Sequence, residues 1–136
     1  MKRDWSKLFK SYASSGVYTI GPMSHLSEIE QKAVAHGLAF FSVDLSGVRT
    51  KEAFLWATSQ ALRFPSYFGM NWDAFEECIT DFAWAPASGY VLAFDHVEDF
   101  AQNVPRELRT ARSIFRSAAA FWKKQSTPFF VLVVKS

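Results

Sequence analysis

The sequence predicts an α/β fold in which a small, mainly parallel β-sheet packs with helices, in a single domain of 136 residues. Residues 89–94 (GYVLAF) and 129–134 (FFVLVV) are almost entirely apolar, which is typical of central strands in a parallel sheet. Candidate strands alternate with candidate helices along the chain, and this alternation favours a layered α/β architecture. A chain of this length can bury a substantial core, and 14 Phe residues are available to fill it.

The chain is expected to open with an arm over residues 1–15, with a helical turn over residues 5–12. The residue pattern predicts strands at 16–20, 39–45, 89–94 and 129–134. The predicted helices are 24–36, 51–62, 72–82, 97–101 and 105–124, of which the fourth is a single turn.

β-branched and aromatic residues identify the first two strands, GVYTI and AFFSVDL. Ser27 and Glu30 have the spacing of a capping box near the start of the first helix, and Gly37 suits its end. Thr50 is placed to cap the second helix. Pro65 ends that helix, because proline disfavours helical backbone in the residue before it.

Asn71 is a good N-cap for the third helix, which follows a loop at residues 67–70. The long helix that begins at Pro105 carries an apolar stripe with helical spacing. Its members are Leu108, Ala111, Phe115, Ala118 and Trp122. Pro128 then separates this helix from the last strand.

Charge is segregated along the chain in a way that the net charge of +2 hides. No Lys or Arg occurs in the 42 residues between Arg63 and Arg106, and seven acidic residues lie there. The other 94 residues hold all 15 basic residues and only six acids. Residues 64–105 therefore carry a charge of −7, and the rest of the chain carries +9. This segregation predicts a focused acidic surface suited to a basic partner.

The helix predicted at residues 72–82 divides into two faces at about 100° per residue. The core-facing stripe comprises Trp72, Phe75, Ile79 and Phe82. The opposite face comprises Asp73, Glu76, Glu77, Thr80 and Asp81. Acids four residues apart on a helix repel each other by about a few tenths of a kcal/mol per pair. We interpret this face as a partner-binding surface on which the repulsion is tolerated, in preference to an ordinary solvated helix face.

An aromatic loop, Tyr67-Phe68-Gly69, lies directly before this helix and joins it in the predicted partner-binding surface, together with Asn71. Tyr is a common anchor of protein interfaces. Tyr67 is equally compatible with a ring that lies partly buried over the core, and the sequence leaves both interpretations open.

Residues 67–79, YFGMNWDAFEECI, give the chain a resemblance to the barstar family of small intracellular ribonuclease inhibitors. Its pattern is a Tyr-aromatic-Gly loop, an Asn cap, an Asp-Ala pair and an acid-Cys pair in one register. The resemblance extends over residues 38–136 as the family core, so residues 1–37 would be an N-terminal extension with an added strand and helix. It implies a barstar-like fold in which this helix and loop block the basic active site of a ribonuclease.

Under this resemblance Glu77 replaces the central Asp that enters the phosphate-binding site of the enzyme. Asp73 is then the second acid, Tyr67 the loop aromatic and Thr80 a polar contact at the helix end. The sequence departs from the family pattern at several interface positions. In addition to Glu77 in place of Asp, this chain has Glu76 and Phe82 where the family pattern has Trp, and Ser117 where it has Glu.

The resemblance predicts a non-enzymatic inhibitor or immunity protein, which we expect to be a cytoplasmic monomer when free. A basic ribonuclease or a similar basic protein is its expected partner, with no direct nucleic-acid or membrane contact and no cofactor. No glycine-rich nucleotide-binding motif occurs, and the sole cysteine, Cys78, is expected to be a buried thiol. One alternative is that the fold binds a different protein partner.

A second alternative is a metal-dependent nuclease or phosphoesterase, built from Asp73 or Glu77 with the acids that follow residues 89–94. Those acids are Asp95, Glu98 and Asp99, beside His96. Basic residues of the long helix could also contact a nucleic-acid backbone, although we favour a solvated face for them. They are Arg106, Arg109, Arg112, Arg116 and Lys123.

Overall fold

The chain folds around a four-stranded sheet in the computed structural model, which describes residues 3–21, 25–66 and 68–135. The strands are β1 (Gly16–Ile20), β2 (Ala39–Asp44), β3 (Tyr90–Asp95) and β4 (Phe129–Val134). The α-helices are α1 (Trp5–Phe9), α2 (Leu26–Ala35), α3 (Lys51–Leu62), α4 (Trp72–Ile79), α5 (Glu98–Asn103) and α6 (Pro105–Lys124). A short 3-10 helix, η1, covers Tyr12–Ser14.

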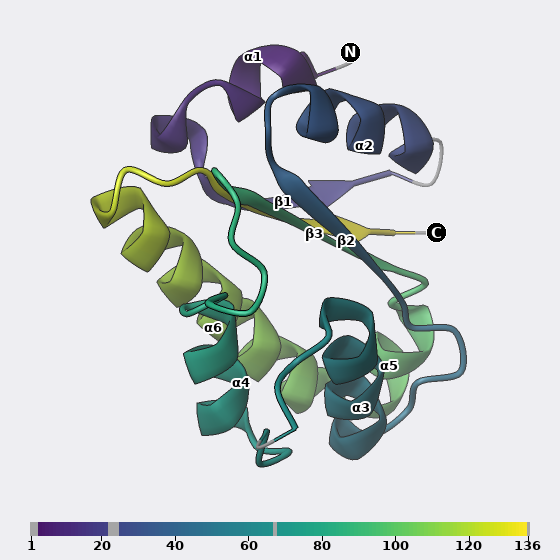
Figure 1. The fold of residues 1–136 in the computed structure, drawn as a ribbon. Helices are drawn as coiled ribbons and strands as arrows, with labels where there is room; N and C mark the ends of the chain where they lie inside the picture. The colour runs from purple at the N-terminus through teal and green to yellow at the C-terminus, as the bar shows by residue number, and fades with distance from the viewer. Residues whose placement is uncertain (1–2, 22–24, 67, 136) are drawn as a thin grey trace.

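The sheet has the order β1-β4-β3-β2, and all its strand pairs are parallel. The α/β prediction is therefore confirmed, with every connection crossing a face of the sheet as parallel pairing requires. The helices form two layers (Figure 1): α1 and α2 lie over one face, and α3, α4, α5 and α6 lie over the other. The helices in the described part of the chain are too short or too polar to cross a bilayer.

Strand β4 explains why both faces are covered, because all six of its residues are buried. Phe129, Val131 and Val133 belong to the larger core, under α3, α4, α5 and α6. Phe130 and Leu132 belong to the second core, under α1 and α2. Burial on both faces is the usual state of a parallel sheet, and β3 and β4 achieve it here.

The N-terminal segment is more than the arm expected from the sequence, because it builds this second core. Trp5 and Phe9 of α1 are buried. The Phe9 ring meets Phe130 of β4 edge-on, with ring centroids 5.0 Å apart. Strand β1 adds to the sheet beside β4, pairing Gly16 with Phe130 along to Ile20 with Val134.

Helix α2 corrects one prediction of local structure. The predicted start, residue 24, lies outside the described residues, and the observed helix begins at Leu26. Its N-cap is His25, with no side-chain capping bond, so the capping box predicted at Ser27 and Glu30 is wrong. The predicted stop is confirmed: Gly37 has φ 78°, and Leu38 N–H donates to the Ala33 carbonyl.

Most of the other element ends agree closely with the sequence, apart from the end of α4. Thr50 caps α3 by accepting a hydrogen bond from Ala53 N–H at 3.0 Å. Helix α6 runs from Pro105 to Lys124 as predicted. Strand β2 ends one residue early, and α5 is a six-residue helix in place of the predicted single turn at residues 97–101.

We predict that Phe9→Ala lowers the free energy of unfolding by about 3–5 kcal/mol, because a buried ring and its contacts are lost. Tyr12→Ala is the matched control, since Tyr12 is 45% exposed, and it should change stability by less than about 0.5 kcal/mol. Urea unfolding followed by circular dichroism measures both. Equal stabilities of the two variants would contradict a structural role for α1.

Candidate partner-binding surface

The acidic helix α4 begins at a well-formed cap. Asn71 has extended backbone angles, and its side-chain Oδ1 accepts a hydrogen bond from Ala74 N–H at 2.8 Å. The same side chain donates through Nδ2 to the Gly69 carbonyl at 3.3 Å, which links the loop to the helix. Asp73 lies in the first turn, where a negative charge is favoured by the helix dipole. Asn71 therefore acts as the predicted cap and orders the loop as well.

Helix α4 ends at Ile79, three residues earlier than predicted. The Thr80 hydroxyl donates to the Glu76 carbonyl at 2.8 Å, and Phe82 adopts a left-handed backbone with φ 53°. The Phe82 ring stacks on Tyr90 of β3, with ring centroids 4.2 Å apart. The packing of Phe82 thus stops the helix, and Asp81 follows the helix instead of extending its outer face.

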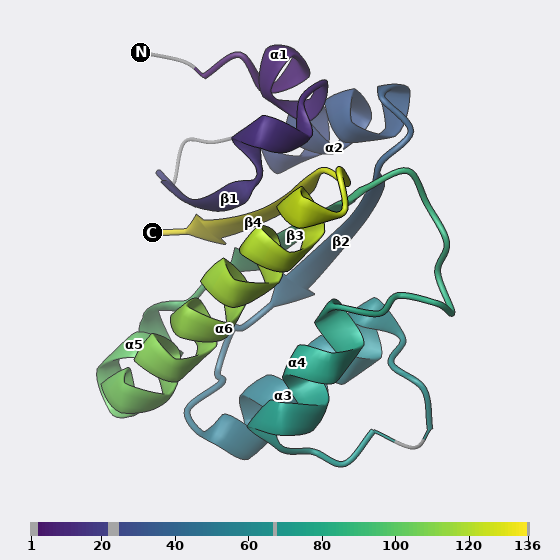
Figure 2. The same cartoon turned by 90° about the vertical axis from the view of Figure 1, so that its left-hand side faces the viewer.

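Helix α4 lies alongside α6 (Figure 2). Two tryptophans join these helices, one at each end. The Trp72 indole N–H donates to Glu107 Oε2 at 2.8 Å, near the start of α6. The Trp122 indole N–H donates to the Ile79 carbonyl at 2.8 Å, near the end of α6. Between these bonds, Phe75 is fully buried in the larger core. The inner face of α4 is therefore fixed at three points along its length.

Three exposed carboxylates lie on or next to α4: Asp73 and Glu77 on its outer side, and Asp81 just beyond its end. None of the ion pairs formed between described residues involves them. Glu76 is half-buried and lies at the flank of this surface. Thr80 is also half-buried, and its hydroxyl is engaged with helix carbonyls. The predicted face of four acids and a hydroxyl is thus reduced to three fully presented charges.

In the preceding loop, the predicted anchor Tyr67 lies outside the described residues. Phe68 is half-buried and meets Phe64 edge-on, with ring centroids 4.9 Å apart. Gly69 is exposed, and so is Met70, which has a left-handed backbone with φ 53°. Phe68 therefore supports the loop from inside, and Met70 is an exposed apolar side chain that the sequence analysis did not single out. No local pattern identifies Met70, because its exposure depends on the fold of the loop.

The sequence model of one protein family, Barstar (barnase inhibitor), matches residues 38–134. The chain belongs to the barstar family. The match begins just before β2 and ends with β4, so it includes α4, its loop and α6. A comparison with curated proteins finds none that matches the chain.

The cysteine of the barstar motif, Cys78, is buried on the inner side of α4, as predicted. Burial raises the pKa of its thiol to about 11, and the nearby carboxylates of Asp81 and Glu77 act in the same direction. A thiol with this pKa stays protonated at neutral pH, when its nucleophilicity is low. Cys78 therefore contributes packing beneath the acidic surface.

Asp44 and Asp95, the last residues of β2 and β3, and Asp99 of α5 make local contacts at the carboxyl end of these strands. His96 Nδ1 lies 3.1 Å from Asp44 Oδ1 and 3.7 Å from Asp95 Oδ2. Hydrogen bonds from the Ser46 side chain and backbone lower the pKa of Asp44, with a smaller effect from His96. Asp99 accepts a hydrogen bond from Gly47 N–H at 3.1 Å. Within the described ranges, no three His, Cys, Asp or Glu side chains gather as a metal site would require.

We predict that the free energy of unfolding falls as pH rises from about 8.5, the ordinary thiol pKa, towards the folded-state pKa of about 11. The unfolded thiol ionises first in this window, so stability is lost as the pH increases. Cys78→Ala should show a shallower decline, because it lacks this thiol. Urea unfolding of both proteins at a series of pH values, under reducing conditions, measures the difference. Parallel curves would mean that the folded thiol titrates normally.

Proposed function

We propose that this barstar-family chain is a non-enzymatic protein inhibitor of a ribonuclease, and that α4 enters the basic active site of the enzyme. Membership of a family described as barnase inhibitors supports the class of function. The observation that carries the mechanism is the set of exposed carboxylates at Asp73 and Glu77, on the outer side of α4, and at Asp81, just beyond its end. A protein of this kind acts by occupying the site where RNA binds.

The chemistry of such a target explains why carboxylates suit it. A ribonuclease binds the phosphates of RNA with Arg and Lys side chains, and a carboxylate accepts the same charge-assisted hydrogen bonds. Asp73 and Glu77 are one helical turn apart, about 6 Å along the axis, so they can reach two adjacent cationic groups. A surface with exposed carboxylates also steers a basic enzyme toward it during diffusional encounter.

The anchoring of α4 supports tight binding. Its two ends are hydrogen-bonded by Trp72 and Trp122, and its inner face is buried, so little backbone freedom remains to be lost on association. The Glu77 side chain retains its own rotamer freedom. Because Glu77 is one methylene longer than the Asp implied by the family resemblance, its carboxylate lies farther from the helix axis. This length favours an enzyme with a deeper or wider phosphate site.

Several features bear on which enzyme this chain would bind. Glu76 and Ser117 replace the Trp and Glu implied by the resemblance, so the presented surface differs from the family pattern on both α4 and α6. These substitutions favour a cognate ribonuclease of its own, or another basic protein with a similar cleft. A chain with one cysteine needs no disulfide, and we place this inhibitor in the cytoplasm.

The test is inhibition of candidate basic ribonucleases from the same cell, including any product of a neighbouring gene, with a fluorogenic RNA substrate. We expect Asp73→Ala and Glu77→Ala each to weaken inhibition by more than about 1 kcal/mol, because each removes a charge from the centre of the interface. Glu30→Ala is the matched control, since Glu30 is an exposed acid on α2, across the sheet. It should change affinity by less than about 0.5 kcal/mol.

Two results would count against the proposal. If no such ribonuclease is inhibited at micromolar concentration, the inhibitory function is wrong. If a ribonuclease is inhibited but the α4 variants bind as well as the wild type, the function stands and α4 is not the interface. Glu77→Gln separates charge from shape, because it keeps the side-chain length and removes the carboxylate.

A further inference from the structure

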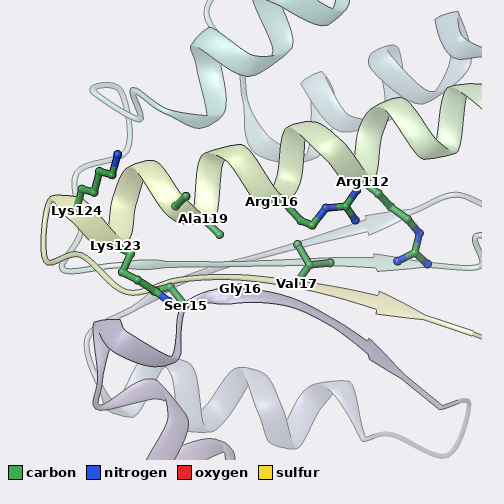
Figure 3. Close-up of a pocket in the computed structure, with 9 residues that line it drawn as sticks. Ser15, Gly16, Val17, Arg112, Arg116, Ala119, Lys123 and Lys124 are labelled. Carbon is green, nitrogen blue, oxygen red and sulfur yellow. The ribbon is translucent and has the colours of Figure 1, made fainter.

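A groove that presents the cationic side chains of Arg112, Arg116 and Lys123 lies on the other side of α6 from the acidic helix. It has a volume of about 490 Å³ and runs between α6 and the start of β1. Arg112 points from α6 toward the sheet, Arg116 runs along α6 toward Arg112, and Val17 points back toward the helix (Figure 3). Lys123 reaches toward Ser15 at the far end of the groove, whereas the Lys124 side chain points from the last turn of α6 away from β1. The family match begins at residue 38, so β1, which forms one wall, lies outside it.

The three cations that face this groove are available to a ligand, and Lys124 adds positive charge at its rim. Arg116, Lys123 and Lys124 are exposed, and Arg112 is partly exposed. The ion pairs found within the described ranges do not include any of them. Such a concentration of positive charge on one strip of surface attracts an anionic partner.

The β1 wall offers unused backbone hydrogen-bonding groups. β1 is an edge strand, and its Ile20 carbonyl accepts a hydrogen bond from Lys135 N–H on the β4 side. Because backbone groups alternate in direction along a strand, Val17 and Thr19 point their N–H and C=O groups outward. In the described part of the chain, no other segment bonds to these outward groups. The strand edge is therefore open to pairing.

We propose that this groove binds an extended acidic segment of a partner protein, which pairs with β1 as a further strand of the sheet. The spacing of the charges agrees with this mode of binding. Arg112 and Arg116 are about 6 Å apart along the helix axis, and alternate residues of a strand are about 6.6 Å apart. Acids at alternate positions of the added strand would therefore meet successive cations of α6, as in recognition by strand addition.

The groove suits a polypeptide better than a nucleic acid. Val17 and Thr19 present both donors and acceptors at the open edge, and a peptide backbone can satisfy both, whereas a phosphate can only accept. The groove lining includes the apolar side chains of Val17 and Ala119, and among the described residues no aromatic side chain lines it for base stacking. The groove and α4 lie on different sides of α6 (Figure 2), so both surfaces can be occupied together.

The test uses a fluorescein-labelled eight-residue peptide of alternating Glu and Val, with binding to the full chain followed by fluorescence anisotropy. We expect binding that weakens with salt, and a loss of about tenfold in affinity for the double variant Arg112→Glu/Arg116→Glu. Arg106→Glu/Arg109→Glu is the matched control: it makes the same charge change at exposed positions of α6 outside the groove lining, and should retain most of the affinity.

Amide hydrogen exchange supplies the structural readout. On peptide addition, exchange at Val17 and Thr19 should slow, and a peptide N-methylated at alternate residues should no longer bind. Absence of peptide binding, or equal loss of affinity in both double variants, would overturn the proposal. So would tighter binding of an eight-nucleotide RNA without protection at Val17 and Thr19. Concentration-dependent dimerisation that protects these amides without peptide would assign the edge to a second copy instead.

Discussion

The burial of the central strands on both faces is the constraint on which the rest of the structure depends. Every residue of β4 is buried, and alternate side chains enter two separate cores. Exposing either set would cost about 25 cal/mol for each Å² of apolar surface. The N-terminal helices cover one face, and the four later helices cover the other. A sheet of this composition is stable only as the middle layer of three.

The acidic surface depends on that arrangement through α6. This helix lies against β1 and β4, and its Glu107 and Trp122 side chains form the two hydrogen bonds that hold α4 in position. The repulsion between acids on α4 is small beside the packing of Phe75, Ile79 and Phe82 beneath them. The core therefore stabilises a helix whose outer surface is suited to binding, and the charges are presented without local compensation.

The same long helix separates surfaces of opposite sign. Helix α4, with the exposed Asp73 and Glu77, lies on one side of it, and the groove lined by Arg112, Arg116 and Lys123 lies on the other. A net charge of +2 describes neither surface. Electrostatic recognition acts over about 8–10 Å at physiological ionic strength, so partners respond to the local sign and little to the total. The proposed basic enzyme and the proposed acidic segment would accordingly bind through different faces.

The sequence by itself determined the features that depend on neighbouring residues. Apolar runs defined β3 and β4, Pro105 marked the start of α6, Asn71 marked the start of α4, and the cation-free window located the acidic surface. Only the tertiary structure decided that α4 ends at Ile79, because Phe82 turns to stack on Tyr90 of a later strand. It alone exposed Asp73, Glu77 and Asp81 more fully than Glu76, and it alone brought Arg112 and Arg116 beside β1. These outcomes join residues far apart in the chain, and packing between distant segments leaves no local pattern to read.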